Sequence, residues 1–257
     1  QWTMAMNVYK KYGAVPKDLF PETESSKNTG EMNTQLRHLL HTAVAHMYAA
    51  EGDTAKVEQI IAETTAAGHR ILTIHLGEPP VSFDWEWTDA DGEFHRDGEI
   101  TPVEFWKKYV GPAGLEDYVC LVDDPRAEHA KGKKIGIEHL GNVAGGDATE
   151  YLNVPNQFMK DCVKQILVEQ GIPVWFGADC HPFMDRESGA WATDLFEYGK
   201  VYDVDFDLDK EARVRFGDSA MNHAMAFAGV DVADDGTTRR WRVENSWGAK
   251  IADKGYF

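Results

Sequence analysis

Residues 221–248 read MNHAMAFAGVDVADDGTTRRWRVENSWG, and this stretch decides the fold. It predicts two strands, over 224–232 and 239–244, because Asp234-Asp235-Gly236 between them is a typical turn sequence. The two strands predict an antiparallel hairpin in the last part of the chain.

The pairing of this hairpin brings two polar side chains together. Paired residues in an antiparallel hairpin have numbers with a constant sum, here about 468–470, because the turn centres near residues 234–235. His223 is therefore expected opposite a position between Asn245 and Trp247. An amide oxygen of Asn245 can accept from one imidazole N–H, which fixes the tautomer and leaves the other nitrogen free for a proton-transfer partner. Trp247 could shield that bond from water, although a lone histidine on a strand is more often structural.

The rest of the chain predicts an α+β fold. Apolar residues recur at helical spacing at Leu36, Leu39, Leu40, Ala43, Val44 and Met47. A second helix follows, separated from the first by Gly52 and Asp53. Residues 33–68 are therefore expected to form a helical hairpin. Thr101-Pro102-Val103-Glu104 is a helix-start sequence. The remaining expected elements are strands over 71–76, 115–122 and 172–177, a hairpin over 83–96, helices over 101–109, 155–169 and 209–216, and a polar loop over 22–30.

Composition narrows the functional classes. The chain has 257 residues, with 43 acidic and 26 basic side chains and a net charge of −17. Such a charge argues against nucleic acid and anionic membranes as partners, and no apolar run is long enough to span a bilayer. Three cysteines are too few for a disulfide framework and favour a reducing compartment.

No cofactor or metal is expected from the sequence. His38 and His41 could share a helix face as metal ligands, but no third ligand joins them at helical spacing, so they are interpreted as solvated or packing side chains. The glycines of 124–150 lack the spacing of a phosphate-binding loop.

Met221 to Met225 followed by Trp241 to Gly248 resembles the His and Asn-Ser-Trp-Gly motifs of papain-like cysteine peptidases. The segment RWRVENSWG, with KGYF after it, is similar to the bleomycin hydrolase and bacterial aminopeptidase C branch. Further stretches also resemble that branch, namely residues 1–2, 11–17 and 20–22, Phe83 with Trp85, and residues 101–105. The resemblance covers essentially the whole chain.

The resemblance implies the function and the site. It implies a thiol aminopeptidase that hydrolyses N-terminal residues of short peptides, with His223 carrying the proton, Asn245 orienting His223 and Trp247 supporting them. It also implies a cytoplasmic homohexamer. Within a partial peptidase domain over 1–257, the helical insertion 33–68 could serve assembly, and 172–257 forms the antiparallel sheet or barrel carrying His223 and Asn245.

The cysteines depart from the family pattern. The family's nucleophilic Cys opens a helix and lies before the segment that begins at Gln1, whereas Cys120, Cys162 and Cys180 are interpreted as structural thiols. The chain is therefore expected to be an inactive fragment with an exposed apolar patch beside His223 and Trp247, which would make it dimerise or aggregate. The alternative is a non-catalytic scaffold or oligomerisation fragment of a peptidase-like protein.

Overall fold

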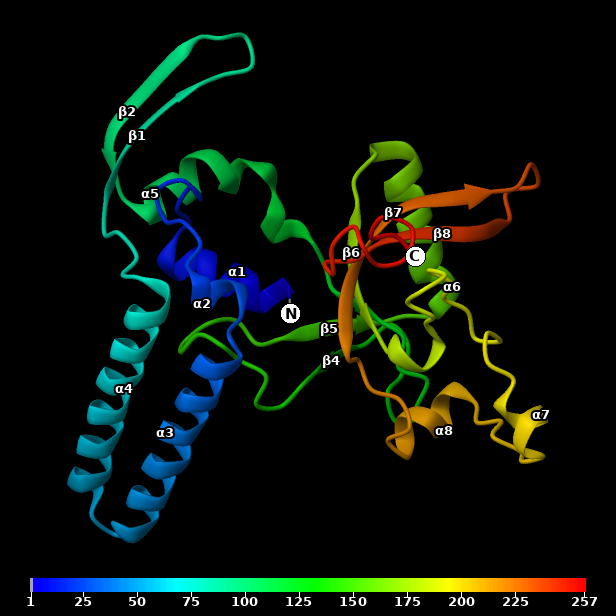
Figure 1. Cartoon of the computed structure of the whole chain (residues 1–257), viewed down its shortest axis with the longest axis horizontal. Helices are drawn as coiled ribbons and strands as arrows, with labels where there is room; N and C mark the ends of the chain where they lie inside the picture. Colours follow the sequence, from blue (N-terminus) through cyan, green and yellow to red (C-terminus); the bar gives the residue numbers. More distant parts are fainter. Residues whose placement is uncertain (1) are drawn as a thin grey trace. The chain divides into compact units, whose positions relative to one another are not determined.

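The computed structural model describes residues 2–257 and divides into two compact units (Figure 1). The first unit comprises residues 2–118 and 141–147, and the second comprises 119–140 and 148–257. The chain thus combines helices with small sheets, in agreement with the predicted class. No helix among residues 2–257 is long and apolar enough to cross a membrane.

The first unit is mostly helical. Its helices and strands are α1 (Trp2–Tyr12), α2 (Glu24–Lys27), α3 (Gly30–Ala49), α4 (Thr54–Leu76), β1 (Phe83–Thr88), β2 (Phe94–Ile100), α5 (Pro102–Phe105), a π-helical turn (Trp106–Val110) and two 3-10 turns (Gly111–Ala113 and Leu115–Asp117).

Helices α3 and α4 form the helical hairpin that the sequence predicts, and they run side by side in Figure 1. The Asp53 side chain caps α4 by accepting from the backbone N–H of Lys56 at 3.0 Å. The buried stripe of α3 is narrower than the predicted face: Met32 and Ala43 are buried, while Leu40 and Val44 are exposed.

The strand predicted over 71–76 is wrong, because α4 continues to Leu76. Its last turn is held by the segment before α3: Thr23 Oγ1 donates to the His75 carbonyl at 2.8 Å, and Ser25 Oγ lies 2.9 Å from His75 Nδ1. The loop predicted over 22–30 is also wrong in part, because Thr23 caps the short helix α2 and Gly30 begins α3. The first correction involves contacts between segments about 50 residues apart, whereas the second involves a local capping box between Thr23 and Ser26.

The hairpin of β1 and β2 and the helix start at Thr101 match the predictions. Thr101 and Glu104 form a reciprocal capping box with Pro102 in the first turn. Gly13, at φ +78°, packs so closely on this turn that a Cβ there would lie 2.1 Å from the Pro102 carbonyl. Only glycine allows this approach.

The second unit carries two three-stranded sheets. Its elements are β3 (Leu121–Val122), β4 (Lys134–Gly136), β5 (Glu150–Asn153), α6 (Asn156–Gln165), a π-helical turn (Ile166–Gln170), β6 (Val174–Ala178), a 3-10 turn (His181–Phe183), α7 (Tyr198–Tyr202), α8 (Lys210–Arg215), β7 (His223–Val232) and β8 (Thr238–Glu244). The strand predicted over 115–122 is wrong except at its end, since residues 115–117 form a helical turn.

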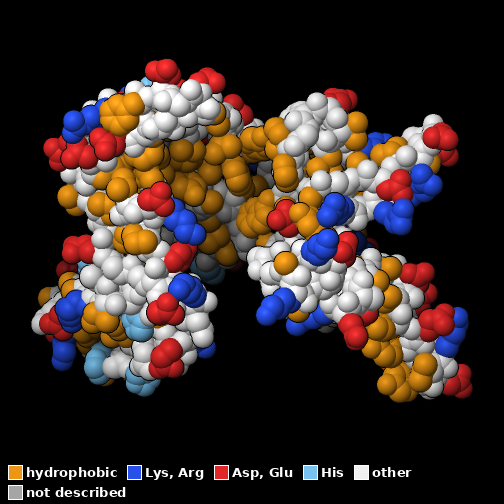
Figure 2. All heavy atoms as spheres, turned by 45° about the horizontal axis from the view of Figure 1, so that its top comes forward, with side chains coloured by type: hydrophobic (Ala, Val, Ile, Leu, Met, Phe, Trp, Pro, Cys, Tyr) orange, Lys and Arg blue, Asp and Glu red, His pale blue; other side chains and the backbone are white. Residues whose placement is uncertain are grey.

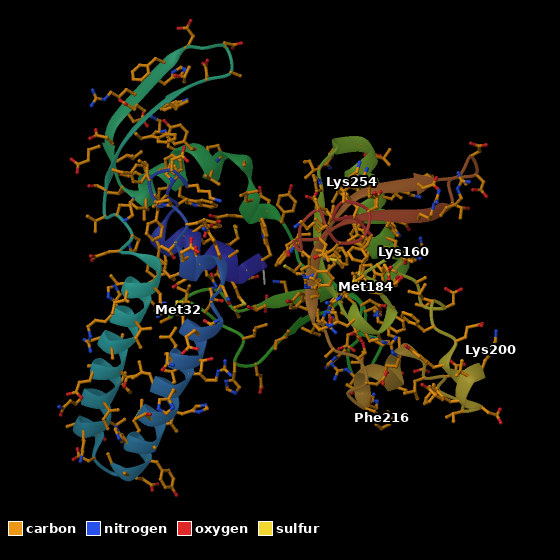
Figure 3. The ribbon with its side chains drawn as sticks, viewed as in Figure 1. Met32, Lys160, Met184, Lys200, Phe216 and Lys254 are labelled. Atoms are coloured by element: carbon orange, nitrogen blue, oxygen red, sulfur yellow. The ribbon has the colours of Figure 1, made fainter. Side chains whose placement is uncertain are left out.

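The sheet β6-β7-β8 is antiparallel throughout. Ala226 pairs with Glu244 and Phe227 with Val243, so the paired numbers add to 470 at the His223 end of the hairpin. Met184, Met225, Val243 and Cys180 form the buried core of the unit, and Figure 3 labels Met184 among the side chains beside this sheet.

Apolar side chains are exposed along residues 196–208, in the same unit as His223. This segment includes α7, and the hydrophobic atoms at the lower right of Figure 2 lie on it. Its most exposed members are Val201, Tyr202 and Phe206. His223 and Trp247 are half-buried, so both border solvent.

Candidate active site

The candidate site lies at the end of the sheet where β7 begins and β8 ends. His223 is the first residue of β7 and pairs with Ala178, the last residue of β6. Asn245 directly follows β8, and its backbone N–H donates to the Gly255 carbonyl at 3.0 Å. Three strand ends and the C-terminal loop therefore fix the two side chains.

His223 Nε2 lies 2.9 Å from Asn245 Oδ1. The backbone N–H of Ser246 donates to the same Oδ1 at 2.8 Å, which fixes the orientation of the amide. Because Oδ1 can only accept, Nε2 must carry the proton, and Nδ1 of the neutral ring is left with its lone pair. Asn245 is only 8% exposed, so this hydrogen bond forms largely away from water.

Trp247 packs on the imidazole. Its ring centroid lies 4.9 Å from that of His223, with the planes 26° apart. The Trp247 and Phe257 rings are nearly perpendicular, with centroids 6.0 Å apart. The Asn245 Nδ2 group is buried without a hydrogen-bond partner among residues 2–257. The Trp247 ring therefore covers part of the His223–Asn245 pair and limits its contact with water.

An open hollow of about 500 Å³ borders this pair. It is lined by His181, Arg186, His223, Trp247 and Ile251. His181 and His223 have ring centroids 6.2 Å apart, and the Arg186 guanidinium lies 4.4 Å from the Trp247 ring centroid. The hollow offers space for a small polar ligand directly beside the imidazole.

The sequence predictions did not include His181, Arg186 or Ile251. These residues lie on irregular segments, and no periodicity or pairing rule relates residues 181–186 to the strand ends. The polar sequence around Asp185 and Gly189 indicates an exposed loop, but it gives that loop no position in space.

A second polar network holds the chain where it enters β7. Asn222 Nδ2 donates to Asp179 Oδ1 at 2.6 Å, and the backbone N–H of Cys180 donates to Asn222 Oδ1 at 3.0 Å. Ser219 Oγ donates to Asp179 Oδ2 at 2.9 Å. Asn222 immediately precedes His223, so this network fixes the backbone from which the imidazole projects.

The three cysteines lie outside the hollow. Cys180 is fully buried and its Sγ lies 3.6 Å from the Ala178 carbonyl oxygen. Burial, together with the nearby Asp179 carboxylate, raises the pKa of the Cys180 thiol to about 11. Such a thiol is a poor nucleophile at neutral pH, in keeping with its interpretation as structural.

Cys180 should therefore resist alkylation. With a pKa near 11, its thiolate fraction at pH 7 is roughly 100-fold or more below that of an ordinary thiol. Iodoacetamide labelling of the folded chain, read by peptide mass mapping, should modify Cys180 last and only after unfolding. Rapid labelling near pH 6 that is lost in His223→Ala would contradict this assignment.

No group of three or more His, Cys, Asp or Glu side chains among residues 2–257 is arranged to hold a metal ion. His38 and His41 are exposed on α3, in the other unit from His223.

Comparison with known proteins gives a consistent group of relatives. A model of the Peptidase C1-like family matches residues 1–257. The chain is 40% identical over 260 residues to aminopeptidase C of Lactobacillus delbrueckii subsp. lactis, covering 100% of the chain and 57% of that protein. It is 36% identical over 266 residues to human bleomycin hydrolase, covering 100% of the chain and 58% of that protein.

The fold is similar to that of a solved relative. The crystal structure of PepW from Lactobacillus rhamnosis HN001 superposes with a TM-score of 0.88 at 38% identity, covering 100% of this chain and 58% of that one. The chain therefore spans a little under three fifths of the length of these relatives.

Proposed function

Because the chain belongs to the Peptidase C1-like family, we propose that the whole protein is a cysteine-type aminopeptidase that removes N-terminal residues from short peptides. The observation that carries the proposal is the 2.9 Å bond from His223 Nε2 to Asn245 Oδ1. It leaves Nδ1 free to exchange a proton beside an open hollow. The relatives named aminopeptidase C and bleomycin hydrolase support the same reaction class.

In the proposed mechanism, His223 accepts a proton and then donates it in each half of the reaction. A cysteine of the whole protein attacks the scissile carbonyl carbon, and its proton goes to His223 Nδ1. The C–N bond then breaks, and the imidazolium gives that proton to the leaving amine. Water next attacks the resulting thioester, His223 accepts the water proton, and the proton returns to the sulfur as the carboxylic product leaves.

Asn245 keeps the ring oriented during these transfers. Its Oδ1 accepts from Nε2–H in both charge states of the imidazole, so the ring does not rotate when Nδ1 is protonated. The Trp247 ring limits water at this bond, which makes the orientation stronger than in an exposed pair.

We also propose a cytoplasmic location and assembly as a hexamer through apolar faces such as that of α3. Leu40, Val44 and Tyr48 lie at a spacing of four residues on this helix and are exposed, Tyr48 to 80%. A single helix face with three exposed apolar side chains supports an interface. Sedimentation equilibrium of the complete gene product tests the assembly.

The activity is tested with the complete gene product. We expect hydrolysis of a free tripeptide such as Ala-Ala-Ala, little hydrolysis of its N-acetylated form, and loss of activity after iodoacetamide treatment. Cleavage of both peptides alike would contradict an aminopeptidase, and insensitivity to alkylation would contradict thiol chemistry.

Replacing Asn245 with alanine should lower kcat about 10- to 100-fold while changing KM little, because the imidazole loses its fixed orientation but the hollow keeps its walls. The measurement is steady-state hydrolysis of Ala-Ala-Ala by the complete gene product. Asn156→Ala is a suitable control, since Asn156 is exposed at the start of α6. An unchanged kcat would remove Asn245 from the mechanism.

One observation favours the alternative, a non-catalytic scaffold. None of Cys120, Cys162 and Cys180 lines the hollow, and the pKa of Cys180 is raised rather than lowered. If the complete gene product binds peptides but hydrolyses none, the His223–Asn245 pair is a structural remnant and the scaffold is the function.

A further inference from the structure

We propose that Arg186 forms a carboxylate-binding subsite on the leaving-group side of His223, so that the preferred substrates are short peptides bearing a carboxylate just beyond the scissile bond. The inference rests on the proposed peptidase function and specifies its substrate class. The carboxylate is either the C-terminal group of a very short peptide or an acidic side chain.

The Arg186 guanidinium is available to a ligand. It has no hydrogen bond or ion pair to any side chain of residues 2–257. It does form a cation–π stack on Trp247, with its central carbon 4.4 Å from the ring centroid. The neighbouring Asp185 carboxylate is already occupied by Ser188 Oγ and by the backbone N–H groups of Glu187 and Ser188. Arg186 therefore keeps its donor groups free while the indole supports its plane.

The backbone at Arg186 is held in place. Its carbonyl accepts from the Ala252 N–H at 3.1 Å, and residues 185–190 form a tight turn in which Gly189 N–H donates to the Asp185 carbonyl. Gly189 has φ +73°, and a Cβ there would lie 2.9 Å from the Ala252 Cβ. The close approach of these two loops places Arg186 at the hollow before any ligand binds.

The spacing suits a carboxylate one or two residues beyond the cleaved bond. Centroid separations of 4.9 Å from His223 to Trp247 and 4.4 Å from Trp247 to Arg186 place the guanidinium at most about 9 Å from the imidazole. An extended peptide advances about 3.3–3.6 Å per residue. The α-carboxylate of a di- or tripeptide can therefore reach Arg186 while the leaving nitrogen lies near His223.

Charge makes this subsite distinctive. The chain has a net charge of −17, so its general field disfavours anionic ligands. The Arg186 guanidinium lines the hollow beside the candidate catalytic pair without an ion pair to any carboxylate of residues 2–257, so it makes the hollow locally favourable to an anion. Its planar donor fork matches a carboxylate and not an amide.

The test compares peptide acids with their amides. The complete gene product and its Arg186→Gln, Arg186→Lys and Arg242→Gln variants are assayed on Ala-Ala-Ala and its C-terminal amide. A second pair, Ala-Asp-Ala amide and Ala-Asn-Ala amide, distinguishes a side-chain carboxylate from the C-terminal one. Arg242 is a matched control because it also stacks on an aromatic ring, that of Tyr256 at 3.8 Å, outside the hollow.

We expect KM to be roughly five- to tenfold lower for the peptide that bears the carboxylate than for its uncharged counterpart. This ratio should fall below about twofold in Arg186→Gln, be intermediate in Arg186→Lys, and be retained in Arg242→Gln. An equal KM for acid and amide in both peptide pairs, or a ratio that survives in Arg186→Gln, would overturn the subsite.

Equilibrium binding of the same peptides to the iodoacetamide-treated protein, followed by NMR, gives a readout that needs no turnover. An acid preference that depends on Arg186, together with no hydrolysis of the same peptides by the untreated protein, supports the subsite and overturns the peptidase function. Hydrolysis without such a preference supports the peptidase and overturns the subsite.

Discussion

Replacing His223 with alanine should lower kcat/KM for Ala-Ala-Ala by about 10³-fold or more in the complete gene product. The side chain is proposed to accept the thiol proton and to donate it to the leaving amine, and a positioned acid–base group contributes about 10²–10⁴-fold. The loss should appear mainly in kcat, because the imidazole acts on groups that develop charge in the transition state. Steady-state kinetics with the free tripeptide measure it directly.

Two further variants make this result specific to the His223–Asn245 pair. His38→Ala should behave as wild type, since His38 is exposed on α3 in the other unit. Asn245→Ala combined with His223→Ala should be no worse than His223→Ala alone, because Asn245 acts only through the ring it orients. Additive losses would show that Asn245 has a separate role, and full activity in His223→Ala would refute the mechanism.

The elements that the sequence predicted well are those with local signals. The hairpin of β7 and β8 has its turn residues between its strands, so its pairing follows from numbering alone. The break between α3 and α4 is likewise marked by Gly52 and by the capping side chain of Asp53.

The two incorrect strand predictions occurred where the chain makes contacts between distant segments. Residues 71–76 have the β-branched and apolar composition of a strand, yet they complete α4 because Thr23 and Ser25 bind its last turn at His75. No pattern within 71–76 contains that information. Residues 115–117 form a helical turn in which the Leu115 carbonyl accepts from Trp2 Nε1 at 3.1 Å, a contact between residues 113 positions apart.

The candidate site divides in the same way. The proximity of His223 and Asn245 could be predicted from the sequence because one hairpin joins them. In the structure, His223 Nε2 lies 2.9 Å from Asn245 Oδ1. Arg186 reaches the hollow through a bond between two irregular loops, from the Ala252 N–H to the Arg186 carbonyl. Loop positions of this kind depend on the folded core and have no period or register in the sequence.

Asn153 shows how the second unit is held together away from the site. Its side chain is fully buried, and it links β5 to the loop that follows β3. Asn153 Oδ1 accepts from the backbone N–H of Asp124 at 2.9 Å and from Lys131 Nζ at 3.1 Å. Its Nδ2 donates to the carbonyls of Asp124 at 3.1 Å and of His129 at 2.7 Å.

In the same loop, the Asp124 carboxylate contacts both Arg126 and His129. The Arg126 guanidinium, which forms the strongest interaction, and His129 hold the pKa of the Asp124 carboxyl well below its ordinary value. Asp124 is itself buried. The Asn153 amide therefore supports the backbone that positions the buried Asp124 carboxylate against Arg126 and His129. A buried carboxylate destabilises the fold once its partners move away.

Asn153→Ala should lower the free energy of unfolding of the second unit by about 3–5 kcal/mol. The substitution leaves the Asp124 N–H and the His129 carbonyl without their side-chain partner, and each unsatisfied buried group costs about 1–3 kcal/mol. The Asp124 carbonyl also loses one of its two donors and keeps only Lys131 Nζ, at 2.9 Å. Urea unfolding followed by near-ultraviolet circular dichroism measures the change. Asn156→Ala, three residues along on an exposed position, should shift the midpoint very little. A loss below about 1 kcal/mol in Asn153→Ala would mean that water replaces the amide, and that the loop is stabilised by the Asp124–Arg126 pair instead.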